Sequence, residues 1–281
     1  MLTKFKSTII TSNNIKKTKR EFINLIGNDF SNDLLDQNDD IEFSSIKLLN
    51  GSIAIFPNTP KLASSLNLLN EEFEEQRGII AISFVSDDID EDHKRFQEIG
   101  LSVSDIKTSN SMDSQGRGAE LVFFSIIKKD SFDLNILIFQ DNDEYFNNNN
   151  KQYDESDISK FNQVVVFSPK VKKIKELLTD KLGIRLALDK VFDFGDGEVR
   201  MLFFRIGGVT IEVVEDKKIS STRFGGIGWH SDNLKSCHER LLKSNFTLSE
   251  IRKGRKPDTL VSTIKNAPVD IPTIIIGFDA Q

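Results

Sequence analysis

Three polar side chains in otherwise apolar surroundings could carry chemistry: Gln163, Glu212 and His230. Glu212 stands in the middle of the apolar run VTIEVVE, where a buried carboxylate must be hydrogen-bonded or paired. His230 follows the single tryptophan of the chain and directly precedes a predicted helix. Because an imidazole exchanges a proton near neutral pH, His230 is a candidate general acid or base. Glu212 is a second acid–base candidate, and the Gln163 amide can orient a substrate.

Each of these residues also has a structural interpretation. Glu212 could be a buried carboxylate held by hydrogen bonds, or paired with Arg200 or Arg205 on the neighbouring strand. His230 could fill the space between a sheet and a helix. Gln163 could be a polar residue satisfied by its neighbours. The sequence leaves both interpretations open.

Two basic turns could bind an anion. Arg255 lies in the run RKGRKPD before a predicted strand, and Arg117 lies in SQGRGAEL. A guanidinium at either place can clamp a substrate carboxylate through two parallel hydrogen bonds. The alternative is a solvated basic loop. Neither turn has a phosphate-loop pattern, so a nucleotide site is not supported.

The remaining reactive residues have simpler expected roles. Cys237 lies between Leu234 and Leu241 in an apolar helical stripe, so we expect a buried thiol rather than a nucleophile. His93 and His238 fall in polar helical stretches, where we expect them to be solvated.

Composition limits the class of protein. The 281 residues include 37 Lys and Arg against 43 Asp and Glu, a net charge of −6 that argues against a nucleic-acid partner. One cysteine excludes a disulfide framework and fits a reducing compartment. Because no apolar run has the length of a membrane helix or of a signal-peptide core, we expect a cytoplasmic protein without a membrane partner.

One pattern occurs four times along the chain. The four segments begin at Ser12, Ser86, Ser168 and Ser231 and read SNNIKKTKREFINLIG, SDDIDEDHKRFQEIG, SPKVKKIKELLTDKLG and SDNLKSCHERLLKSN. Each serine precedes an aliphatic residue by three positions, and a second large apolar residue follows seven positions later. This spacing predicts a helix with the serine as N-cap. Each helix should end at a left-handed cap, namely Gly27, Gly100, Gly183 and Asn245.

An extended run precedes each predicted helix and two or three follow it, so the unit is βαβββ and the fold class is α+β. We expect an N-terminal half at 1–140, with modules at about 1–60 and 74–140, and a C-terminal half at 161–281, with modules at about 161–216 and 222–281. The polar stretch 141–160 reads as the linker. Part of 28–45 reads as a loop, and the stretch from Leu62 to Phe73 reads as a connecting helix.

A tandem of βαβββ modules with a capped helix after the first strand resembles the vicinal oxygen chelate superfamily, which includes glyoxalase I, extradiol dioxygenases and bleomycin-resistance proteins. The fourth module, from GGIGWHSDNLKSCHERLLKSN to IPTIIIGFD, is similar to the glyoxalase-like domain. The resemblance implies that paired modules curve eight strands into a cup with the helices outside and the active site inside.

The resemblance also implies where metal ligands would lie, because metal-dependent members place them on the first and last strands of each module. The first-strand position falls on Ser7, Ala81, Gln163 and Gly226, and the last strand of the third module offers Glu212. Gln163 and Glu212 would thus be an incomplete ligand set for a divalent ion acting as a Lewis acid. His230 could add a third ligand from a shifted position.

Three functions remain open on this basis. The first is a glyoxalase-like enzyme of lyase or isomerase type acting on an oxygen-rich metabolite, with Glu212 and His230 as acid–base groups and Gln163, Arg255 and Arg117 binding substrate. The second is a non-catalytic small-molecule binding protein of the bleomycin-resistance kind. The third is a degenerate relative that acts through protein contacts. A cup can form within the chain or across a homodimer.

Overall fold

The computed structural model describes residues 1–68, 78–141, 152–195 and 197–278, and these form four consecutive βαβββ modules. The first two modules contain β1 (Leu2–Ser12), α1 (Ile15–Ile26), β2 (Ser31–Asp36), β3 (Ile41–Leu48), β4 (Gly51–Pro57), α2 (Lys61–Ser65), β5 (Gly78–Ser86), α3 (Ile89–Glu98), β6 (Lys107–Asp113), β7 (Gly118–Ile126) and β8 (Ile136–Gln140).

The last two modules contain β9 (Lys160–Ser168), α4 (Val171–Glu176), a π-helical turn η1 (Leu177–Lys181), β10 (Arg185–Asp193), β11 (Glu198–Ile206), β12 (Val209–Glu215), β13 (Arg223–His230), α5 (Leu234–Lys243), β14 (Arg252–Lys253), β15 (Thr259–Ile264), a short 3₁₀ turn η2 (Pro268–Asp270) and β16 (Thr273–Phe278). The predicted α+β fold of four repeated modules is confirmed.

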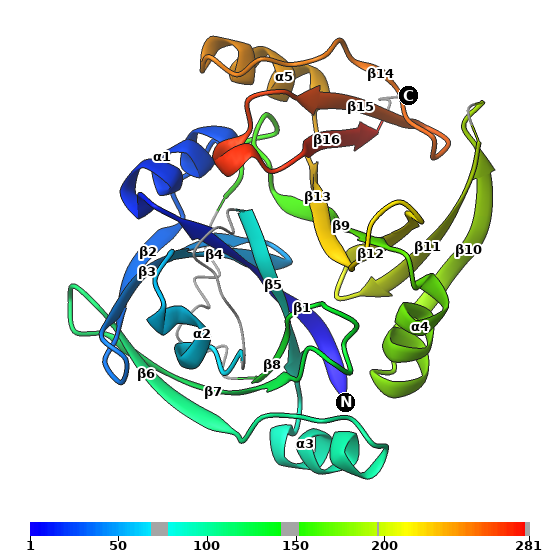
Figure 1. Cartoon of the computed structure of the whole chain (residues 1–281). Coiled ribbons are helices and arrows are strands. Elements are labelled where there is room, and N and C mark those ends of the chain that lie inside the picture. The colour runs from blue at the N-terminus through cyan, green and yellow to red at the C-terminus, as the bar shows by residue number, and fades with distance from the viewer. Residues whose placement is uncertain (69–77, 142–151, 196, 279–281) are drawn as a thin grey trace.

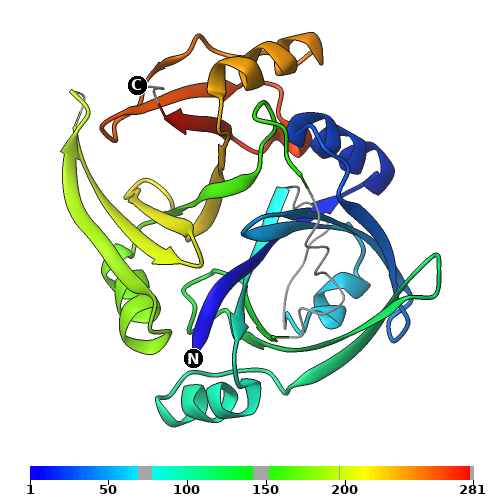
Figure 2. The same ribbon diagram turned by 180° about the vertical axis from the view of Figure 1, so that it is seen from behind.

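The two pairs of modules differ in how their sheets close. Strands β1 to β8 form a closed barrel in the order β1-β4-β3-β2-β6-β7-β8-β5. Strands β9 to β16 form an open sheet in the order β10-β11-β12-β9-β13-β16-β15-β14, with β10 and β14 at its edges. Figure 1 looks into the barrel, and Figure 2 shows from behind how the open sheet curves beside it.

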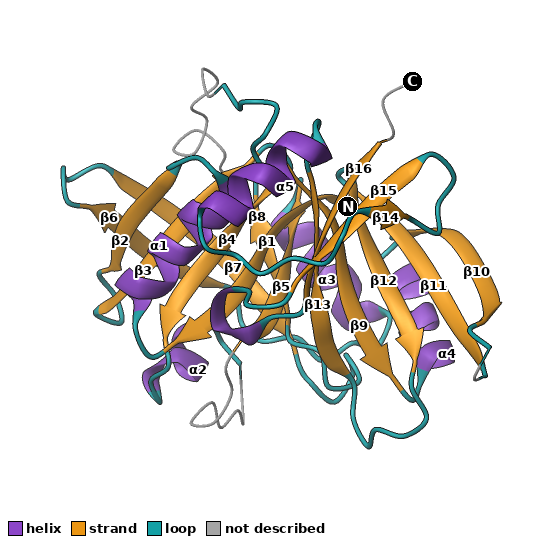
Figure 3. Ribbon diagram, turned by 90° about the horizontal axis from the view of Figure 1, so that it is seen from above, coloured by secondary structure: helices purple, strands orange, loops and turns teal. Residues whose placement is uncertain are grey.

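The helices lie outside the sheets, with the exception of α2, which lies at one end of the barrel (Figure 3). One face of each long helix is buried; in α1 this face comprises Thr18, Phe22, Leu25 and Ile26. Phe22 packs edge-on against Trp229 of β13, so a helix of the first module contacts the first strand of the fourth. The two halves of the chain therefore share a continuous apolar core.

The expectation that part of 28–45 is a loop is confirmed for 28–30 and 37–40, and the rest of the stretch belongs to β2 and β3. Leu34 and Asp36 are buried while Asp33 and Leu35 face outward or lie at the surface. The acidic and amide residues therefore lie on a strand whose alternate positions face the barrel interior. Their abundance masked a regular alternation.

The left-handed helix ends are confirmed, and the N-caps are corrected. Gly27, Gly100, Gly183 and Asn245 all have positive φ. The side chains that cap the helix N-termini belong to Asn14, Asp88 and Asn233, which accept from the backbone N–H three residues on. The serines of the repeat lie two residues earlier than these caps. In three modules the serine Oγ accepts a hydrogen bond from the backbone N–H two residues further on; these serines are Ser12, Ser86 and Ser168. This local turn competes with capping of the helix by the same side chain.

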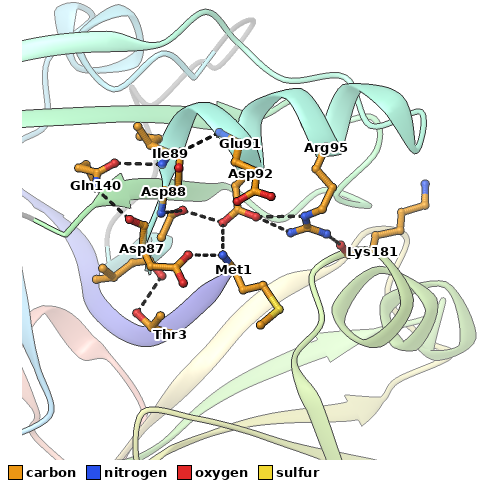
Figure 4. Close-up of polar contacts among 12 residues, drawn as sticks. Met1, Thr3, Asp87, Asp88, Ile89, Glu91, Asp92, Arg95, Gln140 and Lys181 are labelled. Atoms are coloured by element: carbon orange, nitrogen blue, oxygen red, sulfur yellow. Dashed lines mark hydrogen bonds and ion pairs between the residues drawn. The ribbon is translucent and has the colours of Figure 1, made fainter.

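Two repeat-equivalent arginines join the halves. Arg240 of α5 donates from Nη2 to the carbonyl oxygen of Leu25 at 2.9 Å, at the end of α1. Arg95 of α3 donates from Nη1 to the carbonyl oxygen of Lys181 at 3.0 Å, at the end of η1. Both acceptors lie two residues before the left-handed glycine of their module. Figure 4 shows Arg95 held between Asp92 and Lys181.

The histidines of the same helices are bonded rather than solvated, which corrects the expectation for them. Nε2 of His93 lies 2.9 Å from the carbonyl oxygen of Ser104, and Nε2 of His238 lies 3.0 Å from that of Ser249. Each imidazole thus fixes the chain that follows its helix. Cys237 is fully buried, as expected.

Two predictions extend beyond the described residues. The connecting helix expected from Leu62 to Phe73 is shorter than expected, because α2 ends at Ser65 and Asn67 has a positive φ. Residues 69–73 of that stretch lie outside the described residues, as does 142–151 of the expected linker. Within the described part of the chain, no helix has the length and apolarity to cross a membrane.

Candidate functional site

Glu212 and Gln163 lie together on the concave face of the open sheet. β12 and β9 are parallel neighbours, and Thr210 is in register with Gln163, so Glu212 is the next inward-facing residue of β12. Nε2 of Gln163 donates to Oε2 of Glu212 at 2.5 Å. Glu212 is only 9% exposed. The structure thus brings these two candidate residues into direct contact.

Burial sets the protonation of this carboxyl group. Loss of solvent raises the pKa of Glu212 to about 7, and the positive charge of Arg255 and the hydrogen bond from Gln163 act in the opposite direction. A carboxyl group in this state is present in both protonated and ionised form at neutral pH, so it can accept or donate a proton.

Arg255 is the basic residue whose charge acts on Glu212, which corrects the pairing expected from the neighbouring strand. Arg200 forms hydrogen bonds with Asp189, and Arg205 donates to Thr210. Arg255 lies in the β14–β15 hairpin with its guanidinium carbon 4.0 Å from the ring centre of Phe194, which follows β10. This contact joins residues next to the two edge strands of the open sheet.

His230 is not part of this group of contacts. Its Nε2 lies 2.9 Å from Oδ1 of Asp232, and its ring packs edge-on against Phe278 of β16. The side chain is 13% exposed. These contacts are those of an imidazole that fills the end of its strand, and they do not include Glu212 or Gln163.

Arg117 lies in the other half of the molecule, in the β6–β7 hairpin. Its Nε donates to Oδ2 of Asp113 at 2.8 Å, and its backbone N–H donates to Oδ1 of the same carboxylate. The hydrogen bonds of Arg117 thus stabilise the β6–β7 turn in which it lies. The structure therefore brings together Gln163, Glu212 and Arg255, and it places His230 and Arg117 elsewhere.

A cavity of about 580 Å³, which the sequence did not predict, lies inside the N-terminal barrel. Two stacked pairs of phenylalanine rings line it. Phe43 and Phe56 stack with 4.6 Å between ring centres and 9° between planes, and Phe123 and Phe139 stack at 5.0 Å and 26°. The barrel order places these pairs on opposite walls, one on β3 and β4 and one on β7 and β8.

The two aromatic pairs occupy equivalent positions of the repeat. Phe56 is in register with Thr11, and Phe139 is in register with Val85. Thr11 and Val85 both lie four residues before the first residue of the helix that follows their strand. Because β1 and β5 are antiparallel, the equivalence places one pair towards each end of the barrel. The shared spacing of these phenylalanines was the sequence signal for the cavity.

Hydroxyl groups make up most of the polar lining. Six serines line the cavity: Ser7, Ser45, Ser52, Ser65, Ser109 and Ser111. Ser7 is hydrogen-bonded to Ser83 at 2.6 Å. Ser111 is 1% exposed, and its Oγ has no hydrogen-bond partner among the described residues. A buried hydroxyl without a partner loses its hydrogen bonds to water without compensation. A ligand atom that forms a hydrogen bond with Ser111 Oγ would replace one of these lost hydrogen bonds.

By sequence, no protein-family model and no curated protein matches the chain. By structure it is similar to a triple mutant of 4-hydroxymandelate synthase from Streptomyces coelicolor, with a TM-score of 0.69 and 9% identity over 100% of this chain and 94% of the other. It is also similar to the Mn(II)-bound glyoxalase from Novosphingobium aromaticivorans, with a TM-score of 0.65 and 13% identity over 98% and 82% of the two chains.

A third solved structure, the halotolerant catechol dioxygenase BphC, matches with a TM-score of 0.61 and 9% identity over 99% of this chain and 87% of the other. Glyoxalases and dioxygenases are the classes that the repeat resembles, and the matches extend over nearly the whole chain. The chain has the vicinal oxygen chelate fold. At these identities the likeness establishes the fold and not the activity.

The ligand positions of a vicinal oxygen chelate fold can now be tested on this chain. The inward last-strand positions equivalent to Glu212 are Ala54, Leu137 and Ile274, none of which can bind a metal. At the first-strand position Gly226, an added Cβ would lie 2.2 Å from the carbonyl oxygen of Pro272, so no side chain fits there.

Gln163 and Glu212 are thus the two candidate metal ligands at these positions, and they are hydrogen-bonded to each other. Among the described residues, no three His, Cys, Asp or Glu side chains form a group that could hold a metal ion. One carboxylate and one amide are fewer than the ligands that divalent sites use. The residues of this vicinal oxygen chelate fold therefore do not fit a resident metal ion.

Proposed function

We propose that the protein binds a small, largely apolar, ring-containing molecule inside the N-terminal barrel. The observation that carries this proposal is the cavity of about 580 Å³ with stacked phenylalanine pairs on opposite walls and the buried hydroxyl of Ser111, which has no hydrogen-bond partner among the described residues. This corresponds to the binding function that the sequence left open beside an enzyme.

The chemistry of the lining supports such a ligand. Small-molecule sites are mostly apolar, with a few placed polar groups, and their volumes fall at about 300–1,000 Å³. Aromatic rings stack or pack edge-on with a ring of the ligand, which adds to the free energy of burying apolar surface. Serine hydroxyls can donate to or accept from an uncharged polar group of the ligand.

The proposal can be tested by filling the cavity. N-phenylnaphthylamine, a neutral probe whose fluorescence rises in apolar surroundings, should bind the parent protein saturably. In the variant Ser111→Leu the larger side chain occupies ligand space, so we expect the dissociation constant to rise at least about tenfold. The free energy of unfolding without ligand should not fall, because Ser111 loses no hydrogen bond.

Asn110→Leu is the matched control, because Asn110 lies on the same strand with its side chain exposed on the other face. It should bind the probe as the parent does. Equal loss of affinity in both leucine variants, or unchanged affinity in Ser111→Leu, would show that the probe binds elsewhere and would contradict the proposal.

A second candidate function is proton transfer in the C-terminal cup, and the environment of Glu212 favours it. The carboxyl group is buried, has a pKa of about 7 and is held by Gln163 with Arg255 nearby. Such a group can take a proton from carbon beside a carbonyl and return it, as in an isomerase. Under this function Gln163 fixes the carboxyl orientation, and Arg255 binds an anionic part of the substrate.

Deuterium uptake by a panel of α-hydroxy ketones in heavy water, followed by proton NMR, tests this second function. The parent should catalyse exchange, and Glu212→Gln should lower the rate by at least about a hundredfold. Glu215→Gln, at the end of the same strand, should retain it. Absence of exchange in the parent with every ketone would count against proton transfer from carbon and leave the binding function standing.

A further inference from the structure

We propose that the ligand of the N-terminal barrel is an aromatic amine, bound as the ammonium ion, whose charged group contacts Asp36 and Ser111 while its ring packs against the phenylalanines. This inference rests on the proposed binding function and adds the ligand class to it. It comes from a carboxylate and a hydroxyl group that line the same part of the cavity.

Asp36 and Ser111 are neighbours across two strands. In the antiparallel ladder of β2 with β6, Asp36 is in register with Ser111. Residues directly opposite each other in such a ladder have their side chains on the same face, with the Cβ atoms about 4.5–5.5 Å apart. Both residues line the cavity, and they are 5% and 1% exposed. One group of a ligand can therefore contact both side chains.

The carboxylate of Asp36 is held in place through one of its two oxygens. Oδ1 accepts the backbone N–H of Asn38 at 2.9 Å and that of Asp39 at 3.4 Å, which fixes the side chain at the end of β2. Among the described residues, no donor or cation contacts Oδ2. Lys107, which is close to this turn, pairs instead with Oδ2 of Asp39 at 2.6 Å.

An ammonium group fits these two side chains. A carboxylate withdrawn from bulk water gains most from a cation that also donates a hydrogen bond. An ammonium carries three N–H donors, so one can bond Oδ2 of Asp36 and a second can bond Oγ of Ser111. The hydroxyl of Ser111, which has no partner among the described residues, would thereby gain one.

The lysines that line the cavity lie away from Asp36. Strand β2 runs from Ser31 to Asp36, about 17 Å at the rise of an antiparallel strand. Lys47 lies beyond the opposite end of this strand, because Ser31 is in register with the residue that precedes Lys47. Lys4 and Lys6 belong to β1, which β4 and β3 separate from β2 in the barrel order. The charge next to a ligand group at Ser111 is therefore that of Asp36.

The position of the nearest aromatic pair sets the distance between the ammonium and the ring. Asp36 is in register with Ile41 of β3, and Phe43 is the next residue of β3 on the same face. Phe43 stacks on Phe56, so this pair lies about 7 Å along the strand from Asp36. An amine joined to its ring through a chain of about two carbons matches this spacing.

Two compounds with the same skeleton test the inference. Naphthylethylamine is an ammonium ion at neutral pH, and naphthylethanol is uncharged. Displacement of N-phenylnaphthylamine gives the dissociation constant of each compound. We expect the parent to bind the amine at least about tenfold more tightly than the alcohol. In Asp36→Asn this preference should fall about tenfold, with the affinity for the alcohol nearly unchanged. Asparagine can keep the backbone hydrogen bonds through its amide oxygen.

Glu42→Gln is the matched control, because it removes one negative charge from an exposed position of β3 next to Ile41. It should keep the preference of the parent. If the parent has no preference for the amine, or if the preference persists in Asp36→Asn or falls equally in Glu42→Gln, the role of Asp36 is overturned while the binding function stands. If neither compound binds the parent, or if both bind Ser111→Leu as they bind the parent, the binding function itself fails.

Discussion

Replacing Glu212 by glutamine should stabilise the folded protein by about 3 kcal/mol above pH 7 and leave its stability unchanged near pH 4. The carboxyl group is buried and its pKa is raised from 4.5 to about 7, so the folded protein bears the cost of an enclosed charge once the group ionises. Glutamine has the same shape, can still accept the hydrogen bond from Gln163 and carries no charge.

The direction of the pH dependence follows from the two protonation equilibria. Below about pH 4.5 the group is protonated in both folded and unfolded chains and contributes nothing. Between 4.5 and about 7 the folded protein binds more protons than the unfolded chain, so the stability of the parent falls as the pH rises. The variant lacks this dependence, and the difference between the two grows across the same window.

Urea denaturation of both proteins from pH 4 to pH 8 measures this difference. Glu215→Gln is the control on the same strand, because Glu215 is partly exposed and pairs with Lys217. Parallel stability curves for the parent and Glu212→Gln would mean that the carboxyl group is solvated in the folded protein, and they would remove the basis for proton transfer at this position.

Replacing Arg240 by methionine should lower the free energy of unfolding by about 3 kcal/mol. The guanidinium donates to four backbone carbonyl oxygens, those of Asn24, Leu25, Ile26 and Ser156. Three of them are at the C-terminal end of α1, where carbonyl groups lack helical partners and the helix dipole favours a cation. Methionine keeps much of the apolar stem but leaves these acceptors without the charge-assisted bonds.

Urea denaturation at neutral pH tests this expectation, with Lys235→Met as the control because Lys235 is exposed on the same helix. The control should change stability by less than about 0.5 kcal/mol. A loss of similar size in both variants, or none in Arg240→Met, would contradict a joining role for the arginine between α1 and α5.

The modules were predictable from the sequence because their determinants are local. A glycine or asparagine with positive φ ends each helix, and the apolar residues seven positions apart share one face, so spacing alone revealed the repeat. The N-caps were misassigned because a serine two positions before the true cap forms a competing local turn. Alternation indicated that Gln163 faces the cup, and Glu212 was a candidate through the resemblance; their contact follows from the parallel pairing of β9 with β12.

The partners of these residues depend on contacts between distant segments. Arg200 was a reasonable partner for Glu212 on the adjacent strand, but Asp189 of the edge strand takes its guanidinium. Arg255 approaches Glu212 because the open sheet curves until its two edge hairpins meet at Phe194. That curvature is a property of the whole sheet, and the spacing of residues within one strand does not reveal it.

The cavity was missed for a related reason. Its serines and phenylalanines carry no titratable group, so their residue types do not indicate acid–base or metal chemistry. They line one cavity because eight strands close into a barrel. This closure depends on strand pairing between the first and second modules, such as that of β2 with β6.

A crystal structure of the complex with N-phenylnaphthylamine tests the proposed binding function most directly. We expect ligand density inside the N-terminal barrel, with the rings in van der Waals contact with Phe56 or Phe139 and a polar atom or bound water within hydrogen-bond distance of Ser111 Oγ. Density in the C-terminal cup beside Glu212, with the barrel cavity empty of ligand, would contradict it.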